Sequence, residues 1–80
     1  MDVYAEIRGM IAKELMLEEK EIVPDADLQD DLGADSLGLL SLSEAIAARY
    51  GIELIADDLI DARTVGELAG LIEARISSKG

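Results

Sequence analysis

The sequence predicts an all-α fold, a small bundle of three main helices plus one short helix, with a long first loop. Three segments carry apolar residues at i, i+3, i+4 and i+7, which is the spacing of an amphipathic helix. No segment alternates apolar and polar residues as a strand would. With 80 residues, 50% of them hydrophobic, the chain is expected to form one domain over residues 1–80 around an aliphatic core.

The first helix is expected from Val3 to Met16, with Asp2 as its N-cap. A long connection follows over residues 17–35. A loop of this length in so small a domain is either functional or disordered. Four apolar residues favour a loop that packs on the core: Ile22, Val23, Leu28 and Leu32.

The second helix is expected from Ser36 to Tyr50, capped by Asp35 and ended by Gly51. Successive residues of a helix are about 100° apart, which separates its two faces. The core-facing residues are Leu39, Leu42, Ile46 and Tyr50. The opposite face holds Leu37, Leu40, Ser41, Glu44 and Ala48.

Two further helices complete the predicted bundle. A short one fits residues 57–61. The last begins after Thr64, which forms a capping box with Glu67, and an apolar stripe from Val65 to Ile76 follows. Residues 77–80 are expected to be a frayed tail.

The composition excludes several function classes. There are 18 acidic residues against 7 basic ones, a net charge of −11, which argues against nucleic acid and anionic membranes as partners and favours basic surfaces. The chain has no cysteine and no histidine, so it lacks thiolate chemistry, Cys/His metal sites and a histidine base for a serine nucleophile. The N-terminus has no signal-peptide features. We therefore expect a cytoplasmic monomer that is neither an enzyme nor inserted into a membrane.

The most informative segment is Gly33-Ala34-Asp35-Ser36-Leu37, at the start of the second helix. Backbone N–H groups in a first turn lack partners and the helix dipole is positive there, so a phosphodiester on Ser36 would be favoured by roughly 0.3–1 kcal/mol. Gly33 allows a sharp turn and leaves room for an enzyme to reach the hydroxyl. Asp35 can cap the helix and hold a divalent cation brought by a phosphoryl-transfer enzyme. Taken alone, Asp35 and Ser36 are equally consistent with an ordinary helix start.

From Val3 to Ile76 the pattern resembles the acyl carrier proteins of fatty-acid and polyketide synthesis. These are small acidic helical bundles with a long first loop and a Gly-x-Asp-Ser-Leu motif opening the second helix. Here that motif follows Asp30-Asp31-Leu32. Apolar positions also match: Ile7, Ile11, Leu15, Ile22, Leu28, Leu32, Ile46, Val65 and Ile72.

The resemblance implies a free-standing carrier. A phosphopantetheinyl transferase would use coenzyme A and Mg²⁺ to place 4′-phosphopantetheine on Ser36, between Asp35 and Leu37. Acyl groups would then be carried as thioesters on the thiol at the end of this phosphopantetheine arm, partly shielded between helices. The pathway would be fatty-acid, lipid or polyketide biosynthesis. The partners would be acyl-transfer, synthase and acyl-modifying enzymes.

The second helix departs from the family pattern. In the family, the outward face of this helix is commonly rich in acids that pair with Arg and Lys on partner enzymes. In this chain, Gly38 and Ser41 stand at two of the commonly acidic positions. One interpretation is that these positions have drifted in sequence and that docking relies on the remaining acids. The other is a specialised carrier that docks on basic or apolar surfaces. The expected partner-binding residues are Leu37, Leu40, Ser41, Glu44, Ala48, Asp57 and Asp58.

The sequence also permits an aminoacyl or peptidyl carrier, or an acidic interaction module without a carrier role. The acidic loop does not have EF-hand spacing, because Asp30 stands at the glycine position and Ser36 at the terminal glutamate position. We expect no specific metal site, only weak divalent binding at Asp30, Asp31 and Asp35 or around Glu53, Asp57 and Asp58. Glycines inside the expected helices, such as Gly9 and Gly70, are expected to serve close helix packing or space for an acyl chain.

Overall fold

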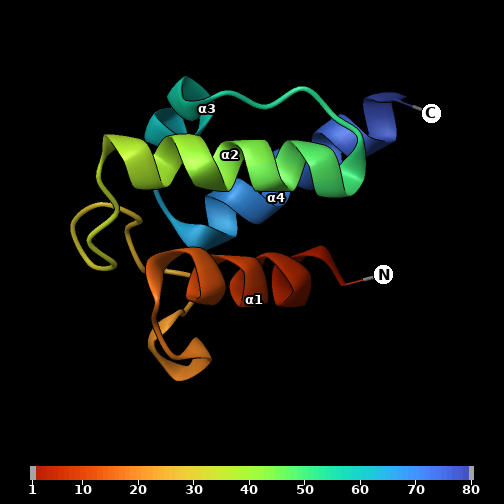
Figure 1. Cartoon of the computed structure of the whole chain (residues 1–80). Helices are drawn as coiled ribbons and strands as arrows, with labels where there is room; N and C mark the ends of the chain where they lie inside the picture. Colours follow the sequence, from red (N-terminus) through yellow and green to blue (C-terminus); the bar gives the residue numbers. More distant parts are fainter. Residues whose placement is uncertain (1, 80) are drawn as a thin grey trace.

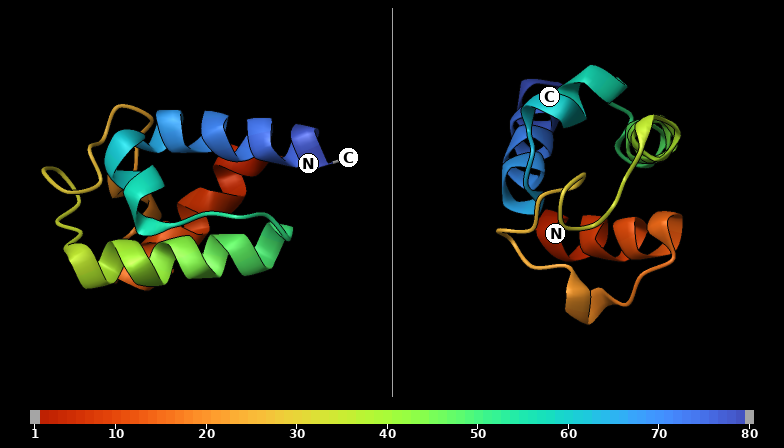
Figure 2. Two further views of the ribbon diagram at one scale, coloured as in Figure 1. Left: turned by 90° about the horizontal axis from the view of Figure 1, so that it is seen from above. Right: turned by 90° about the vertical axis from the view of Figure 1, so that its left-hand side faces the viewer.

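The computed structural model describes residues 2–79 and confirms the all-α fold (Figure 1). The elements are α1 (Val3–Leu15), the 3₁₀ turn η1 (Glu19–Glu21), α2 (Ser36–Tyr50), α3 (Ala56–Asp61) and α4 (Val65–Lys79). Helix α1 packs against α2 and α4, and α3 packs against α2. Figure 2 shows that α2 and α4 run in the same general direction while α1 runs the opposite way.

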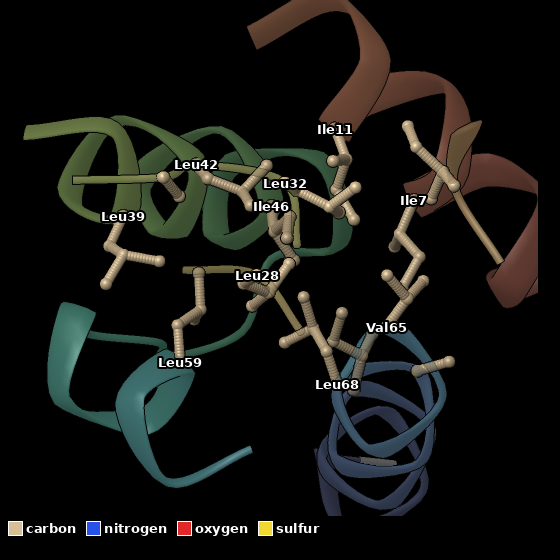
Figure 3. Packing of buried hydrophobic residues seen from close by; sticks show 14 of the residues in the cluster. Ile7, Ile11, Leu28, Leu32, Leu39, Leu42, Ile46, Leu59, Val65 and Leu68 are labelled. Atoms are coloured by element: carbon tan, nitrogen blue, oxygen red, sulfur yellow. The ribbon is translucent and has the colours of Figure 1, made fainter. Parts of the chain in front are cut away.

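The core is aliphatic and receives side chains from every α-helix and from the first loop. Figure 3 shows Leu39, Leu42 and Ile46 of α2 pointing towards the interior, where residues of the other helices meet them. The predicted faces of α2 are confirmed, because these three side chains are buried whereas Leu37 is 74% exposed.

The first loop is folded onto this core. Ile22, Leu28 and Leu32 are buried as expected, but Val23 is 48% exposed, so its predicted inward placement is wrong. The Leu28 N–H donates to the carbonyl of Arg63 at 2.9 Å, which ties the loop to the segment before α4. This attachment fixes the chain that leads into α2.

Most predicted helix ends are confirmed. The Asp2 carboxylate accepts the Ala5 N–H at 3.1 Å, and Thr64 Oγ1 accepts the Glu67 N–H at 3.1 Å, one of the two bonds of the predicted capping box. Gly51 ends α2 in the left-handed region, with φ of 63°. Glycine adopts this conformation without the steric cost that other residues meet.

Three boundaries differ from the predictions. Helix α1 ends at Leu15, because Met16 has φ of 57° and the Leu17 N–H turns back to the Ala12 carbonyl at 2.9 Å. Helix α3 begins one residue early, at Ala56.

The third difference is at the C-terminus, where residues 77–79 continue α4 and do not fray. The Ser78 hydroxyl donates to the Ala74 carbonyl at 3.0 Å, and Lys79 Nζ donates to the Tyr50 carbonyl at 3.1 Å. Gly80, also in the predicted tail, lies outside the described residues.

Side-chain contacts also join α1 to the end of α2. The Tyr50 hydroxyl donates to Glu6 at 2.6 Å, and Arg49 lies 3.5 Å from the same carboxylate oxygen. Partial burial and the Glu6 carboxylate together raise the pKa of Tyr50 to about 12. The phenol, protonated at neutral pH in any case, therefore keeps its proton and this contact further into the alkaline range.

The helix glycines give a direct stability prediction. A Cβ at Gly70 or Gly9 would meet nothing within 4 Å, so close helix packing does not explain either glycine. Gly70→Ala should therefore raise the free energy of unfolding by about 0.5–1 kcal/mol, or about 2–8 °C in the melting temperature. Thermal unfolding followed by circular dichroism measures the change.

Gly66 in the same helix is the matched control. A Cβ there would lie 3.2 Å from the backbone carbonyl oxygen of Pro24, which already accepts the Gly66 N–H at 2.9 Å. Gly66→Ala should thus lower the melting temperature. Equal shifts in the two variants would contradict this account.

Candidate functional site

Ser36 is exposed at the first position of α2, held by a well-defined cap. Asp35 Oδ1 accepts the Gly38 N–H at 2.7 Å, and the Asp35 carbonyl accepts the Leu39 N–H at 2.8 Å. The approach is also fixed, because the buried Ala34 donates its N–H to the Leu28 carbonyl at 2.9 Å. The Ser36 hydroxyl is therefore presented to solvent on an anchored backbone, at the positive end of a 15-residue helix.

Gly33 makes the turn before this cap. Its φ is 74°, in the left-handed region, and a Cβ there would meet nothing within 4 Å. Backbone conformation therefore accounts for the glycine.

A cleft of about 500 Å³ adjoins Ser36. Helix α3 packs against α2 and lies beside its first turns (Figure 1). The first loop, the start of α2 and α3 all contribute to its walls: Gln29, Ala34, Asp35, Ser36, Leu39, Ala56, Asp57 and Ile60. An exposed hydroxyl next to a cleft of mixed polar and apolar character fits an elongated group attached to Ser36.

Asp57 and Asp58 were predicted together as partner-binding residues, but the structure separates them. Asp57 is exposed and lines the cleft. Asp58 faces α4, where Arg75 donates from Nη1 to Oδ2 at 2.9 Å and from Nη2 to Oδ1 at 3.1 Å. The Arg75 hydrogen bonds, followed by the bond from the Ile55 N–H, hold the pKa of Asp58 below its usual value. Of these two aspartates, Asp57 is the one presented at the cleft beside Ser36.

The three carboxylates predicted to bind divalent cations do not converge. Asp30 lies 3.5 Å from Arg63, Asp31 accepts the Asp27 N–H at 2.7 Å, and Asp35 caps α2. Within residues 2–79, no group of three or more metal-ligating side chains is arranged to hold an ion. The predicted weak site therefore has no preformed set of ligands.

Asp27 organises the first loop, a role that was not expected from the sequence. Its Oδ1 accepts the N–H groups of Gln29 at 2.9 Å and Asp30 at 2.8 Å, while Oδ2 lies 3.1 Å from Arg63. The bond from the Asp30 N–H is the main cause that lowers the pKa of Asp27, and Arg63 adds to it. An aspartate that accepts N–H groups two and three residues later forms an Asx-type turn, and this local signal was present in the sequence.

The outward face of α2 places the five predicted residues on one exposed surface: Leu37, Leu40, Ser41, Glu44 and Ala48. Leu37 is 74% and Leu40 is 45% exposed, and Ile60 of α3 is 48% exposed beside the cleft. Gly38 leaves little room for a side chain. A Cβ there would lie 3.3 Å from Asp35 Oδ1 and 3.3 Å from Leu15, so either neighbour would have to move by a few tenths of an ångström.

A membrane-spanning segment is not found within the described part of the chain, since none of its helices is both long and apolar enough to cross a bilayer.

Comparisons with known proteins agree with this geometry. A family model described as "phosphopantetheine attachment site" matches residues 5–72. The chain is 31% identical over 75 residues to an acyl carrier protein of Thermotoga maritima, covering 94% of this chain and 93% of that protein. It is 36% identical over 72 residues to the acyl carrier protein MbtL of Mycolicibacterium paratuberculosis, covering 90% and 81%.

Two solved structures are similar in fold. One is a free-standing peptidyl carrier protein from a secondary metabolic pathway of Acinetobacter baumannii, with a TM-score of 0.81, 32% identity and coverage of 89% of this chain and 88% of that one. The other is the HMG-ACPI domain of the CurA module from Lyngbya majuscula, with a TM-score of 0.84, 29% identity and coverage of 98% and 79%. The chain therefore belongs to the acyl carrier protein family, whose members are not enzymes but carriers with covalently attached 4′-phosphopantetheine.

Proposed function

We propose that Ser36 is the attachment residue and that the chain carries acyl intermediates as thioesters. The observation that carries this proposal is the exposed Ser36 hydroxyl at the start of α2, beside the cleft of about 500 Å³. The arm supplies a thiol, which a chain without cysteine lacks. Asp35 fixes the backbone at Ser36, and Leu39 and Ile60 offer apolar surface along the cleft.

The other serines fit this role less well. The chain has five: Ser36, Ser41, Ser43, Ser77 and Ser78. Ser43 is buried and its hydroxyl donates to the Leu40 carbonyl at 2.8 Å. Ser41 is exposed in the middle of α2, away from the unpartnered N–H groups of the first turn, and the last two are in the final turns of α4. Ser36 alone joins an exposed hydroxyl, a helix start and a neighbouring cleft.

The proposal predicts that one thiol per chain appears at Ser36. The protein is incubated with coenzyme A, Mg²⁺ and a broad-specificity phosphopantetheinyl transferase, and free thiol is then assayed. Wild type should gain one thiol, Ser36→Ala should gain none, and the matched control Ser41→Ala should still gain one. A wild-type chain that gains no thiol would remove the carrier proposal and leave the acidic interaction module.

We propose that the cargo belongs to fatty-acid, lipid or polyketide biosynthesis. The likeness to two acyl carrier proteins supports an acyl cargo. An aminoacyl or peptidyl cargo is the second candidate, favoured by the 32% identity to a peptidyl carrier protein. The mass of the group recovered on the arm from cells that express the pathway separates the two.

We further propose that partner enzymes dock on the outward face of α2 through a surface with an apolar centre and a basic rim. The exposed Leu37 and Leu40 supply the matching apolar centre on this chain. Glu44 and Asp57 supply acids at its margins, and the net charge of −11 attracts a basic rim. Specialised partners of this kind would distinguish the chain from carriers whose α2 is acidic throughout.

This docking proposal predicts that an added acid improves the chain as a substrate for housekeeping fatty-acid synthase enzymes. One extra exposed ion pair is worth about 0.2–1 kcal/mol, so the Ser41→Glu variant that carries phosphopantetheine with a free thiol should gain about 1.5–5-fold in kcat/KM with a synthase transacylase. Ala74→Glu, on exposed α4 surface, adds the same charge as a control and should change little. A wild-type chain already as efficient as an acidic-faced carrier would contradict the proposal.

A further inference from the structure

We infer that Arg75 is a positioning residue that holds α3 in place as one wall of the Ser36 cleft, and thereby maintains the cleft that shields a tethered chain. The second half of this inference rests on the carrier role proposed for Ser36. The first half concerns the folded chain alone and is tested without any attached group.

Helix α3 depends on its neighbours for its position. It has six residues, which is too short for a helix to be stable by itself in water. One attachment is Leu59, which is 1% exposed and points into the core from α3 (Figure 3). A single buried side chain leaves the helix able to pivot about that contact, so a second attachment decides where its cleft-facing side lies.

The helical repeat puts the cleft and Arg75 on opposite sides of α3. Ala56, Asp57 and Ile60 line the cleft. At about 100° per residue, Asp58 lies roughly on the far side from these three, and it is Asp58 that Arg75 binds. Because Arg75 holds α3 from the side away from the cleft, a shift of α3 across the cleft would stretch this pair, and a rotation of α3 about Leu59 would break it.

The contacts of Arg75 suit it for this role. Its two terminal nitrogens bind both oxygens of Asp58 at 2.9 and 3.1 Å, and Nη1 also donates to the Glu53 carbonyl at 2.9 Å. The same Asp58 carboxylate accepts the Ile55 N–H at 3.0 Å, at the start of α3. A two-point bond between guanidinium and carboxylate fixes orientation as well as distance. One α4 side chain thus holds both α3 and the segment that leads into it.

The pair is also shielded in part from solvent. Side-chain exposure is 35% for Arg75 and 21% for Asp58, against 57% and 30% for the pair of Arg49 with Glu6.

Arg49 lies near the opposite end of α2 from Ser36 and serves as a matched control, because Arg49→Gln removes the same charge without touching α3.

Backbone hydrogen exchange on the unmodified chain tests the positioning of α3. The reporters are the N–H groups of Asp58 and Ala62, which donate to the carbonyls of Ile55 and Asp58. Arg75→Gln should lower their protection by roughly tenfold or more while the buried turns of α2 and α4 keep theirs. Asp58→Asn should do the same, and the double variant should add little. Arg49→Gln should leave α3 unchanged.

The second arm tests the cleft. Chains that carry phosphopantetheine on Ser36 are acylated on its thiol with an octanoyl group, and the rate of thioester cleavage by hydroxylamine is measured. Arg75→Gln should react several-fold faster than wild type and Arg49→Gln at the wild-type rate. Unchanged protection of α3, or an equal loss across all helices, would overturn the inference, and loss of protection without faster cleavage would overturn the control of the cleft. A chain on which no phosphopantetheine can be attached refutes the carrier proposal instead. In that case the hydrogen-exchange result still decides whether Arg75 positions α3.

Discussion

Leu28→Ala should lower the free energy of unfolding by about 2–5 kcal/mol, one of the two largest effects expected for a single substitution in this chain. Leu28 is 1% exposed although it belongs to the first loop, and Figure 3 shows it in the centre of the packed side chains. Truncation there removes buried apolar surface and leaves a cavity. A domain of 80 residues has a total stability of about 4–12 kcal/mol, so a large part of it would be lost.

Urea unfolding measures this effect, and Leu37→Ala is its matched control. The same atoms are removed at Leu37, which is 74% exposed, so its stability should stay within about 0.5 kcal/mol of wild type. Similar losses in both variants would show that the loop is not packed as described. Since the Leu28 carbonyl accepts the Ala34 N–H, Leu28→Ala should also loosen the approach to Ser36.

Leu59→Ala is the second large effect, expected at about 2–5 kcal/mol. Leu59 is the one residue of α3 whose side chain is buried. Without it the six-residue helix loses its apolar anchor, and its amides should exchange far faster than those of α2. Urea unfolding combined with hydrogen exchange measures both consequences.

The neighbouring Ile60 provides the control for this prediction. It belongs to the same helix but is 48% exposed at the cleft, so Ile60→Ala should cost far less stability and leave α3 folded. Equal destabilisation by the two variants would contradict the assignment of Leu59 as the anchor.

Local signals explain why most of the fold was predictable. Asp2, Asp35 and Thr64 cap their helices by bonds to N–H groups three residues later, and such bonds depend only on nearby sequence. Gly51 likewise marks a left-handed turn by its residue type. Met16 adopts the same turn without any such signal, and the continuation of α4 to Lys79 depends on a carbonyl of α2 that is distant in sequence.

The candidate site likewise has one part that the sequence predicts and one part that it does not. The motif around Ser36 is contiguous, so its cap and exposure could be expected from the sequence. The cleft needs α3, and the bond between Asp58 and Arg75 joins residues 17 positions apart. Asp57 and Asp58 look equivalent as neighbouring acids, but the helical repeat turns one to the cleft and the other to α4. Their different environments appear only when the helices are placed together.

The most direct test of the central claim is to locate the attached group by mass spectrometry. After reaction with coenzyme A, Mg²⁺ and a phosphopantetheinyl transferase, tryptic peptide 21–49 is isolated and fragmented. It contains Ser36, Ser41 and Ser43, so fragmentation distinguishes the three. Attachment at Ser36 predicts the mass of one phosphopantetheine on that residue in every modified molecule. An unmodified chain, or the added mass on any other serine, would contradict it.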